Sequence, residues 1–177
     1  MMTEINQKEK LLEEIALIPE PKALLAKAKE LLNADDEEKA GENYFTSNFN
    51  GKGSDRYMWE DGGGQEVNII FKADGENEDS ILAYAYDHES AFNVYSQDKP
   101  VIAFKEIPKN MKHLLEESEL KWDWDDLENP KRVHATVAIW REAGDNSWHV
   151  GEKFLEEVEK AKDTGGFKYG FKFFFTK

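Results

Sequence analysis

The chain has 177 residues, 40% of them hydrophobic, and its five Trp and eleven Phe argue against a disordered protein. A chain of this length most often forms one domain, so we expect a single domain over residues 1–177. Asp and Glu number 37 against 23 Lys and Arg, and the resulting net charge of −14 disfavours nucleic acids and anionic membranes as partners.

Two helices are predicted at the amino end. Apolar residues recur on one helical face from Glu4 to Ile18, where Pro19 ends the pattern. Pro21 is well placed to open a second helix that runs to Leu32, because the first helical turn does not need its missing N–H. We expect residues 1–34 to form a helical hairpin.

The hydrophobic period then changes from that of a helix to that of strands. Tyr57–Trp59 and Val67–Phe71 flank the glycine-rich segment Asp61–Gly64, which predicts a hairpin. Phosphate-binding loops also use glycines but lead into a helix, whereas these glycines lead into a strand beside two acidic residues. Ile81–Tyr86 is predicted to be a third strand.

The second half of the chain mixes further strands and helices. Val101–Phe104 is a possible short strand, and Asn110–Leu120 has helical spacing. Val133–Trp140 alternates between apolar and polar positions, as expected of a strand. Glu152–Lys162 is predicted to be an amphipathic helix.

The last segment, Phe167–Phe175, is predicted to be a strand because aromatic residues occupy every second position. Phe167, Tyr169, Phe171, Phe173 and Phe175 would share one face, and Lys168 and Lys172 the other. We interpret the aromatic face as core, because the run itself lacks the polar partners that a cofactor site needs.

These elements together predict an α+β fold with a largely antiparallel sheet, an N-terminal helical hairpin and helices packed on one face. Residues 55–177 would hold the sheet portion. Strands and helices do not alternate regularly enough for a doubly wound parallel sheet.

The first candidate site is the block Tyr84–Ser90. Asp87, His88 and Glu89 could orient a general base or help to bind a metal. Adjacent residues of an extended segment point to opposite faces, however, so the three cannot simply converge on one ion. The alternative is a strand end that turns into a loop, capped by Asp87 or Ser90.

The second candidate site is the block Ile139–His149, which contains the turn-forming residues Asp145 and Asn146. A metal site of two histidines and one carboxylate becomes possible if His88 and His149 meet, with Asp87, Glu89 or Asp145 nearby.

A third candidate is an acidic aromatic segment, Trp122–Glu128. It lacks the glycine and the ligand spacing of a helix–loop–helix calcium site. Aromatics flanked by carboxylates suit a basic protein partner, so the segment is a candidate binding surface. The alternative is a surface loop whose tryptophans turn inward. The binding residues would be Trp122, Asp123, Trp124, Asp125 and Asp126.

Several chemistries have no motif in the sequence. There is no cysteine, and so no disulfide, thiol nucleophile or thiolate zinc site. We find no nucleophile elbow, zinc-binding helix motif or P-loop, so an enzyme is not favoured and no cofactor is expected. Neither a secretory signal nor an apolar run of membrane-spanning length is evident, and we expect a cytoplasmic protein.

The blocks Tyr86–Ser90 and Ile139–Trp148 resemble uncharacterised bacterial proteins of similar size. The acidic, cysteine-free α+β layout is similar to bacterial immunity proteins, including those related to the fungal cell-wall-synthesis regulators. The likeness covers Ile81–His149 and carries over no residue-level activity.

The leading hypothesis is a non-enzymatic, acidic binding protein of the cytoplasm, an immunity-type inhibitor of a basic partner. The strong negative charge would speed association with such a partner, or it only keeps the protein soluble. The alternatives are a metal-dependent hydrolase using His88 and His149, and a regulatory domain with a small-molecule pocket. The oligomeric state stays open.

Overall fold

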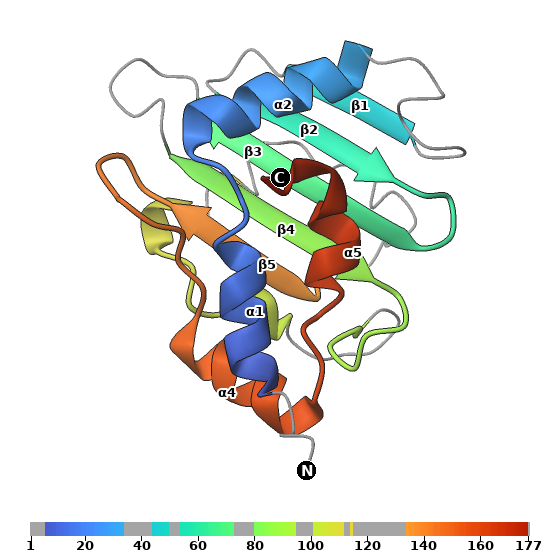
Figure 1. The fold of residues 1–177 in the computed structure, drawn as a ribbon, viewed down its shortest axis with the longest axis vertical. Coiled ribbons are helices and arrows are strands. Elements are labelled where there is room, and N and C mark those ends of the chain that lie inside the picture. The colour runs from blue at the N-terminus through green and yellow to red at the C-terminus, as the bar shows by residue number, and fades with distance from the viewer. Residues whose placement is uncertain are drawn as a thin grey trace.

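The computed structural model of the protein describes residues 6–33, 44–49, 54–72, 80–94, 101–111, 114 and 134–176. Five strands form one sheet in which each strand pairs antiparallel with the next along the chain (Figure 1). They are β1 (Tyr44–Phe49), β2 (Ser54–Glu60), β3 (Gln65–Lys72), β4 (Ile81–Asp87) and β5 (Val137–Arg141). With helices at both ends of the chain, this is the α+β fold that the sequence predicts.

The β2–β3 hairpin forms where the sequence places it. The Asp61 side chain holds the turn, since its Oδ1 accepts the N–H groups of Gly63 at 2.7 Å and Gln65 at 3.1 Å. Gly62 and Gly64 have positive φ angles, which glycine adopts without strain. β1 is not predicted from the sequence, because its central run Thr-Ser-Asn carries no apolar alternation.

The two predicted N-terminal helices are present as α1 (Gln7–Ile15) and α2 (Pro21–Asn33). Asn6 caps α1, its Oδ1 accepting the N–H of Lys8 at 3.0 Å, and Glu159 Oε2 accepts the same N–H at 3.2 Å. α1 contacts α4 (Glu152–Ala161) and the C-terminal helix, whereas α2 lies along β1 on the same face of the sheet (Figure 1).

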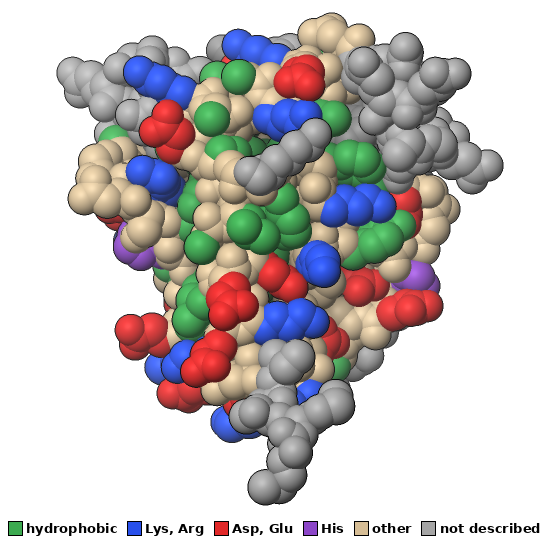
Figure 2. Space-filling view, in the orientation of Figure 1, with side chains coloured by type: hydrophobic (Ala, Val, Ile, Leu, Met, Phe, Trp, Pro, Cys, Tyr) green, Lys and Arg blue, Asp and Glu red, His purple; other side chains and the backbone are tan. Residues whose placement is uncertain are grey.

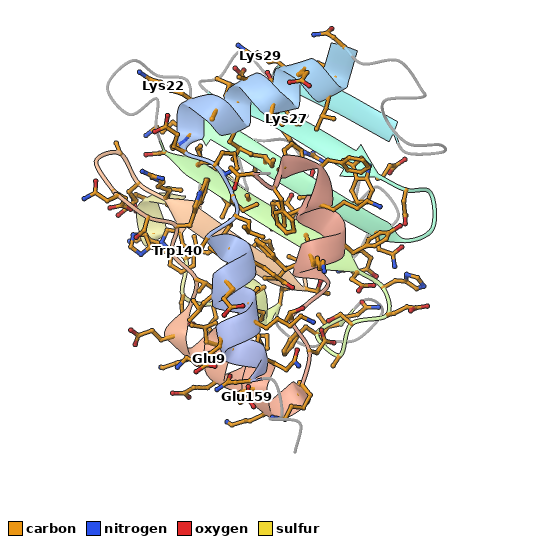
Figure 3. The ribbon with its side chains drawn as sticks, in the orientation of Figure 1. Glu9, Lys22, Lys27, Lys29, Trp140 and Glu159 are labelled. Carbon is orange, nitrogen blue, oxygen red and sulfur yellow. The ribbon has the colours of Figure 1, made fainter. Side chains whose placement is uncertain are left out.

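The predicted helix after residue 151 is confirmed as α4, and its start is held by a distant carboxylate. Glu106 accepts the N–H groups of Lys153 and Phe154, both at 3.1 Å, so a side chain 47 residues earlier satisfies the first turn. Figure 3 shows Glu9 and Glu159 at the α1–α4 end of the molecule, far from Lys22, Lys27 and Lys29 on α2.

Two central predictions need correction. Val101–Phe104 is not a strand, because Ile102–Phe104 forms the short 3₁₀ helix η1. The strand expected over Val133–Trp140 begins only at Val137, and every residue from 135 to 140 is buried. Both faces of β5 are covered, so apolar and polar positions do not alternate with burial there. Residues 110, 111 and 114 are helical, and the rest of the helix expected over Asn110–Leu120 lies outside the described residues.

The predicted final strand is wrong. Residues Phe167–Phe171 form the helix α5, and Lys172–Phe174 continue it as the 3₁₀ helix η2. The buried aromatics Phe167, Phe171 and Phe174 are spaced as on one face of a helix, a period that the aromatic run satisfies as well as alternation.

Glycines decide between the two periods, because they bring this segment against the sheet. Gly165 and Gly166 both have positive φ angles and reverse the chain before α5. A Cβ atom at Gly165 would lie 2.3 Å from the carbonyl oxygen of Thr136, and one at Gly170 would lie 2.9 Å from Ala85 Cβ. A bulkier residue at either position would push the helix off β4 and β5.

We predict that Gly165→Ala destabilises the fold much more than Gly144→Ala. Both positions have positive φ, which costs about 1–2 kcal/mol for alanine, but Gly144 has no atom within 4 Å of an added Cβ. The clash at Gly165 should add about 1–3 kcal/mol. Urea unfolding followed by circular dichroism measures both variants, and equal losses of stability would contradict this packing.

Candidate functional site

Three aromatic rings gather around one lysine where α5, which packs on β3 and β4, reaches Trp59 of β2. Trp59 lies with its ring centre 5.9 Å from Tyr169 and 5.4 Å from Phe173, and both rings are inclined to it. The Lys172 ammonium lies 4.2 Å from the centre of the Tyr169 ring, 5.1 Å from Phe173 and 5.5 Å from Trp59. We call Trp59, Tyr169 and Phe173 the aromatic triad. It binds a cation of the chain itself.

The secondary structure explains how the triad forms. Trp59 pairs with Val67 in the sheet and faces α5, where it is fully buried. Tyr169 and Phe173 stand one helical turn apart in α5 and η2, so both reach the same tryptophan. Tyr169 is 43% exposed and is one of three large hydrophobic residues that the described part of the chain leaves open to solvent. In the triad, Trp59 is therefore buried and Tyr169 is open to solvent.

The Asp61 carboxylate fixes the position of the exposed Tyr169 side chain. The Tyr169 hydroxyl donates to Asp61 Oδ2 at 2.9 Å, while Asp61 Oδ1 is held by the N–H groups of the β2–β3 turn. Partial burial raises the pKa of Asp61, but these hydrogen bonds together hold that pKa below its usual value. The hydrogen bond to Asp61 raises the pKa of Tyr169, and the Asp61 and Asp87 charges contribute to the same shift. Asp61 is thus ionised at neutral pH.

Further carboxylates surround this corner of the sheet. We call Asp61, Asp87 and Glu89 the acidic sheet end. Glu60 and Glu66 pair across β2 and β3 but follow Trp59 and precede Val67, which face α5, so their side chains point to the opposite face of the sheet. Gln65 Nε2 donates to Asp87 Oδ1 at 3.1 Å, which joins the end of β4 to the glycine-rich turn. Asp61 and Asp87 therefore share the α5 side of this end of the sheet.

The first sequence-predicted block lies at this corner. The His88 N–H donates to the Gly64 carbonyl at 3.2 Å, and the Glu89 N–H donates to Asp87 Oδ1 at 3.0 Å. A Cβ atom at Gly64 would lie 2.6 Å from His88 Nδ1, so the imidazole closes over the glycine turn. Asp87 and His88 therefore act here as parts of a strand end that turns into a loop.

The second block lies at the other end of β4. His149 forms an isolated bridge with Trp140, stacks on its ring and contacts Asp145 Oδ2 at 2.9 Å (Figure 3, Trp140). Trp140 pairs with Leu82, six residues before His88, which corresponds to about 20 Å of strand. Among the described residues, no three His, Asp or Glu side chains are placed to hold a metal. The structure does not bring His88 and His149 together, and a hydrolase that uses both is not supported.

Asp145 explains why the second block is polar. Its Oδ2 accepts the Glu142 N–H at 2.9 Å, and its carbonyl oxygen accepts two hydrogen bonds from the Arg141 guanidinium. The loop between β5 and α4 is therefore fastened by its own polar groups.

The predicted binding residues Trp122, Asp123, Trp124, Asp125 and Asp126 lie outside the described residues, and their role stays a prediction. Three acidic stretches of the chain lie outside the described residues: Asp35–Glu38, Asp74–Asp79 and Trp122–Glu128. On the face of the molecule that Figure 2 shows, acidic and basic side chains are interspersed.

The described residues also line a small polar pocket of about 250 Å³ at the far ends of β3 and β4. Its walls are Lys72, Ser80, Asn110, Met111, Glu142 and Ala143. Asn110 Nδ2 donates to Glu142 Oε1 at 2.8 Å, so two of its polar groups already satisfy one another. Pockets for small organic ligands are mostly larger, about 300–1,000 Å³, and more apolar.

Sequence reasoning misses Tyr169, Lys172 and Phe173 as functional candidates, because it places them in a core strand. Their spacing of three and four residues is the signal that would have put them on one helical face. Asp61, the polar partner that the aromatic run lacks, lies 108 residues away in sequence.

No protein-family model, no curated protein and no solved structure matches this chain. In the part of the chain that the structure describes, no helix combines the length and the apolar character needed to cross a bilayer.

We predict that Asp61→Asn lowers the stability at neutral pH but not in acid. The folded-state pKa of Asp61 lies below its unfolded value, so the ionised group stabilises the fold above the unfolded pKa. This contribution is lost as the pH falls through the folded pKa. The variant should unfold about 1 kcal/mol more easily at about pH 7 and like the parent protein at about pH 2.

Urea unfolding at both pH values measures the difference, with the exposed Glu20→Gln as a charge-matched control. A deficit of Asp61→Asn that is equally large in acid would contradict the assignment.

Proposed function

We propose that this protein is a non-enzymatic binding protein that recognises a basic partner through the aromatic triad and the acidic sheet end. The observation that carries the proposal is the cation held by Trp59, Tyr169 and Phe173 beside the ionised Asp61. A surface that binds one ammonium group has the chemistry to recognise another.

The composition of this corner supports a protein partner. Tyrosine and tryptophan are enriched among the residues that dominate binding energy, and they work best beside groups that exclude water. Tyr169 is exposed, and its hydrogen bond to Asp61 fixes the ring before any partner arrives. A pre-positioned side chain loses less conformational entropy on binding.

The charge of the chain supports a basic partner. A net charge of −14 attracts a positive protein over long range and raises its association rate, especially at low salt. The acidic sheet end then supplies short-range complementarity. Inhibition of a basic toxin by a cytoplasmic immunity protein is the activity that these features favour.

The polar residues of the two sequence-predicted blocks support a non-enzymatic role. Asp87 accepts hydrogen bonds from Gln65 and Glu89, and Asp145 holds the loop that carries His149. These side chains fasten turns in the described structure.

We predict salt-dependent binding to a basic protein encoded by a neighbouring gene, with Tyr169 as an anchor. Tyr169→Ala should weaken the complex about tenfold or more, because truncating an interface anchor costs about 2 kcal/mol or more. Raising the salt from about 50 mM to about 500 mM should slow association. Isothermal titration and surface plasmon resonance measure the two effects.

Leu17→Ala is the matched control, since Leu17 is 41% exposed and lies outside the triad. Equal affinity of the Tyr169 and Leu17 variants would contradict the site. Association that is indifferent to salt, or the absence of binding to any basic neighbour, would contradict the basic partner.

A further inference from the structure

Lys172 binds the aromatic triad in a way that leaves it replaceable. Within the described residues its ammonium contacts the three rings and makes no hydrogen bond or salt bridge with a carboxylate. Lys160 and Lys162, by contrast, pair directly with Glu157 and Glu159. Among the described residues, cation–π attraction and the packing of its stem hold the Lys172 side chain in place.

We infer that the aromatic triad is a binding site for a lysine or arginine side chain of a partner, and that Lys172 is an internal occupant which that side chain displaces. The inference deepens the proposed function and rests on it for the identity of the partner. It adds a defined cation site and a competing group within the chain.

The geometry of the rings suits an incoming cation. The Tyr169 and Phe173 rings are inclined by 56° and 60° to Trp59, so more than one π face is turned toward the ammonium. All three ring centres lie within the roughly 6 Å over which cation–π attraction is significant. Lysine and arginine both satisfy this arrangement.

The Asp61 carboxylate makes the site more favourable for a cation. It is ionised, it orients Tyr169, and its Oδ2 accepts the tyrosine hydroxyl while one lone pair of that oxygen remains for a further donor. Lys172 occupies the aromatic triad when no partner is present. A partner that brings further contacts along the acidic sheet end can replace Lys172, whereas a small cation competes less well.

Removing the internal occupant should therefore expose the site. We expect Lys172→Ala to bind tetramethylammonium and N-acetyl-lysine methylamide about tenfold more tightly than the parent protein. The readout is the NMR shift of the Trp59 indole N–H during titration. Lys168→Ala is the matched control, because Lys168 is an exposed lysine of the same helix with no contact to the triad among the described residues.

Two further comparisons separate a cation site from a general apolar surface. N-acetyl-norleucine methylamide, which lacks the charge, should not bind Lys172→Ala measurably. Adding Tyr169→Leu to Lys172→Ala should abolish the response to the charged probes. Lys172→Gln removes the charge but keeps part of the side-chain stem, and it should also bind the probes more tightly than the parent protein if the alanine variant does not fold.

Equal binding by the Lys172 and Lys168 variants would overturn the inference, as would equal binding of the lysine and norleucine probes. These titrations need no protein partner, so their failure is distinct from that of the proposed function. A basic partner that binds normally while Lys172→Ala and Lys172→Gln ignore both cations would refute the cation site alone. Probe binding without any basic partner would refute the proposed function alone.

Discussion

The close approach of the C-terminal segment to β4 and β5 is the constraint on which the rest of the structure depends. Gly165, Gly166 and Gly170 have no side chain where a Cβ atom would meet Thr136, Asp87 or Ala85. The Thr136 hydroxyl then donates to the Gly165 carbonyl at 2.6 Å and accepts the Asp87 N–H at 3.0 Å. Because α5 lies this close, α1 packs on α5 as well as on α4, and Tyr169 reaches the turn after β2. The close packing of this segment on the sheet therefore positions both the buried aromatics of α5 and the candidate site.

The aromatic triad localises a function that the net charge alone cannot. A charge of −14 acts over the whole molecule, and several acidic stretches of the sequence lie outside the described residues. The face of the molecule that Figure 2 shows carries both signs of charge. What distinguishes the corner near Tyr169 is the combination of inclined rings, a bound ammonium and a carboxylate fixed by the β2–β3 turn. Long-range charge brings a basic partner close, and this short-range arrangement selects where it binds.

Local patterns predict the elements whose signals lie within the element itself. Pro21, the glycines of Asp61–Gly64 and the apolar spacing of Glu152–Lys162 place α2, the hairpin and α4 correctly. The segment Phe167–Phe175 fails because aromatics at every second position also satisfy a helical period, and the glycines that decide between them act through contacts with β4 and β5. The site is harder still, since its key hydrogen bond joins residues 108 positions apart and depends on the docking of α5. A short stretch of sequence cannot predict this hydrogen bond, because the contact depends on how α5 packs on the sheet.

An internal cation gives the site selectivity that an open aromatic surface would lack. An exposed tryptophan and phenylalanine beside carboxylates would attract many apolar and cationic groups. Lys172 covers Trp59 and Phe173 and competes at the high effective concentration of a group on the same chain. Only a partner whose other contacts outweigh this competition gains access, which is specificity obtained by disfavouring weak binders. Because Asp61 stays ionised well below neutral pH, the balance between the two cations is set by the partner's contacts and not by small changes in pH.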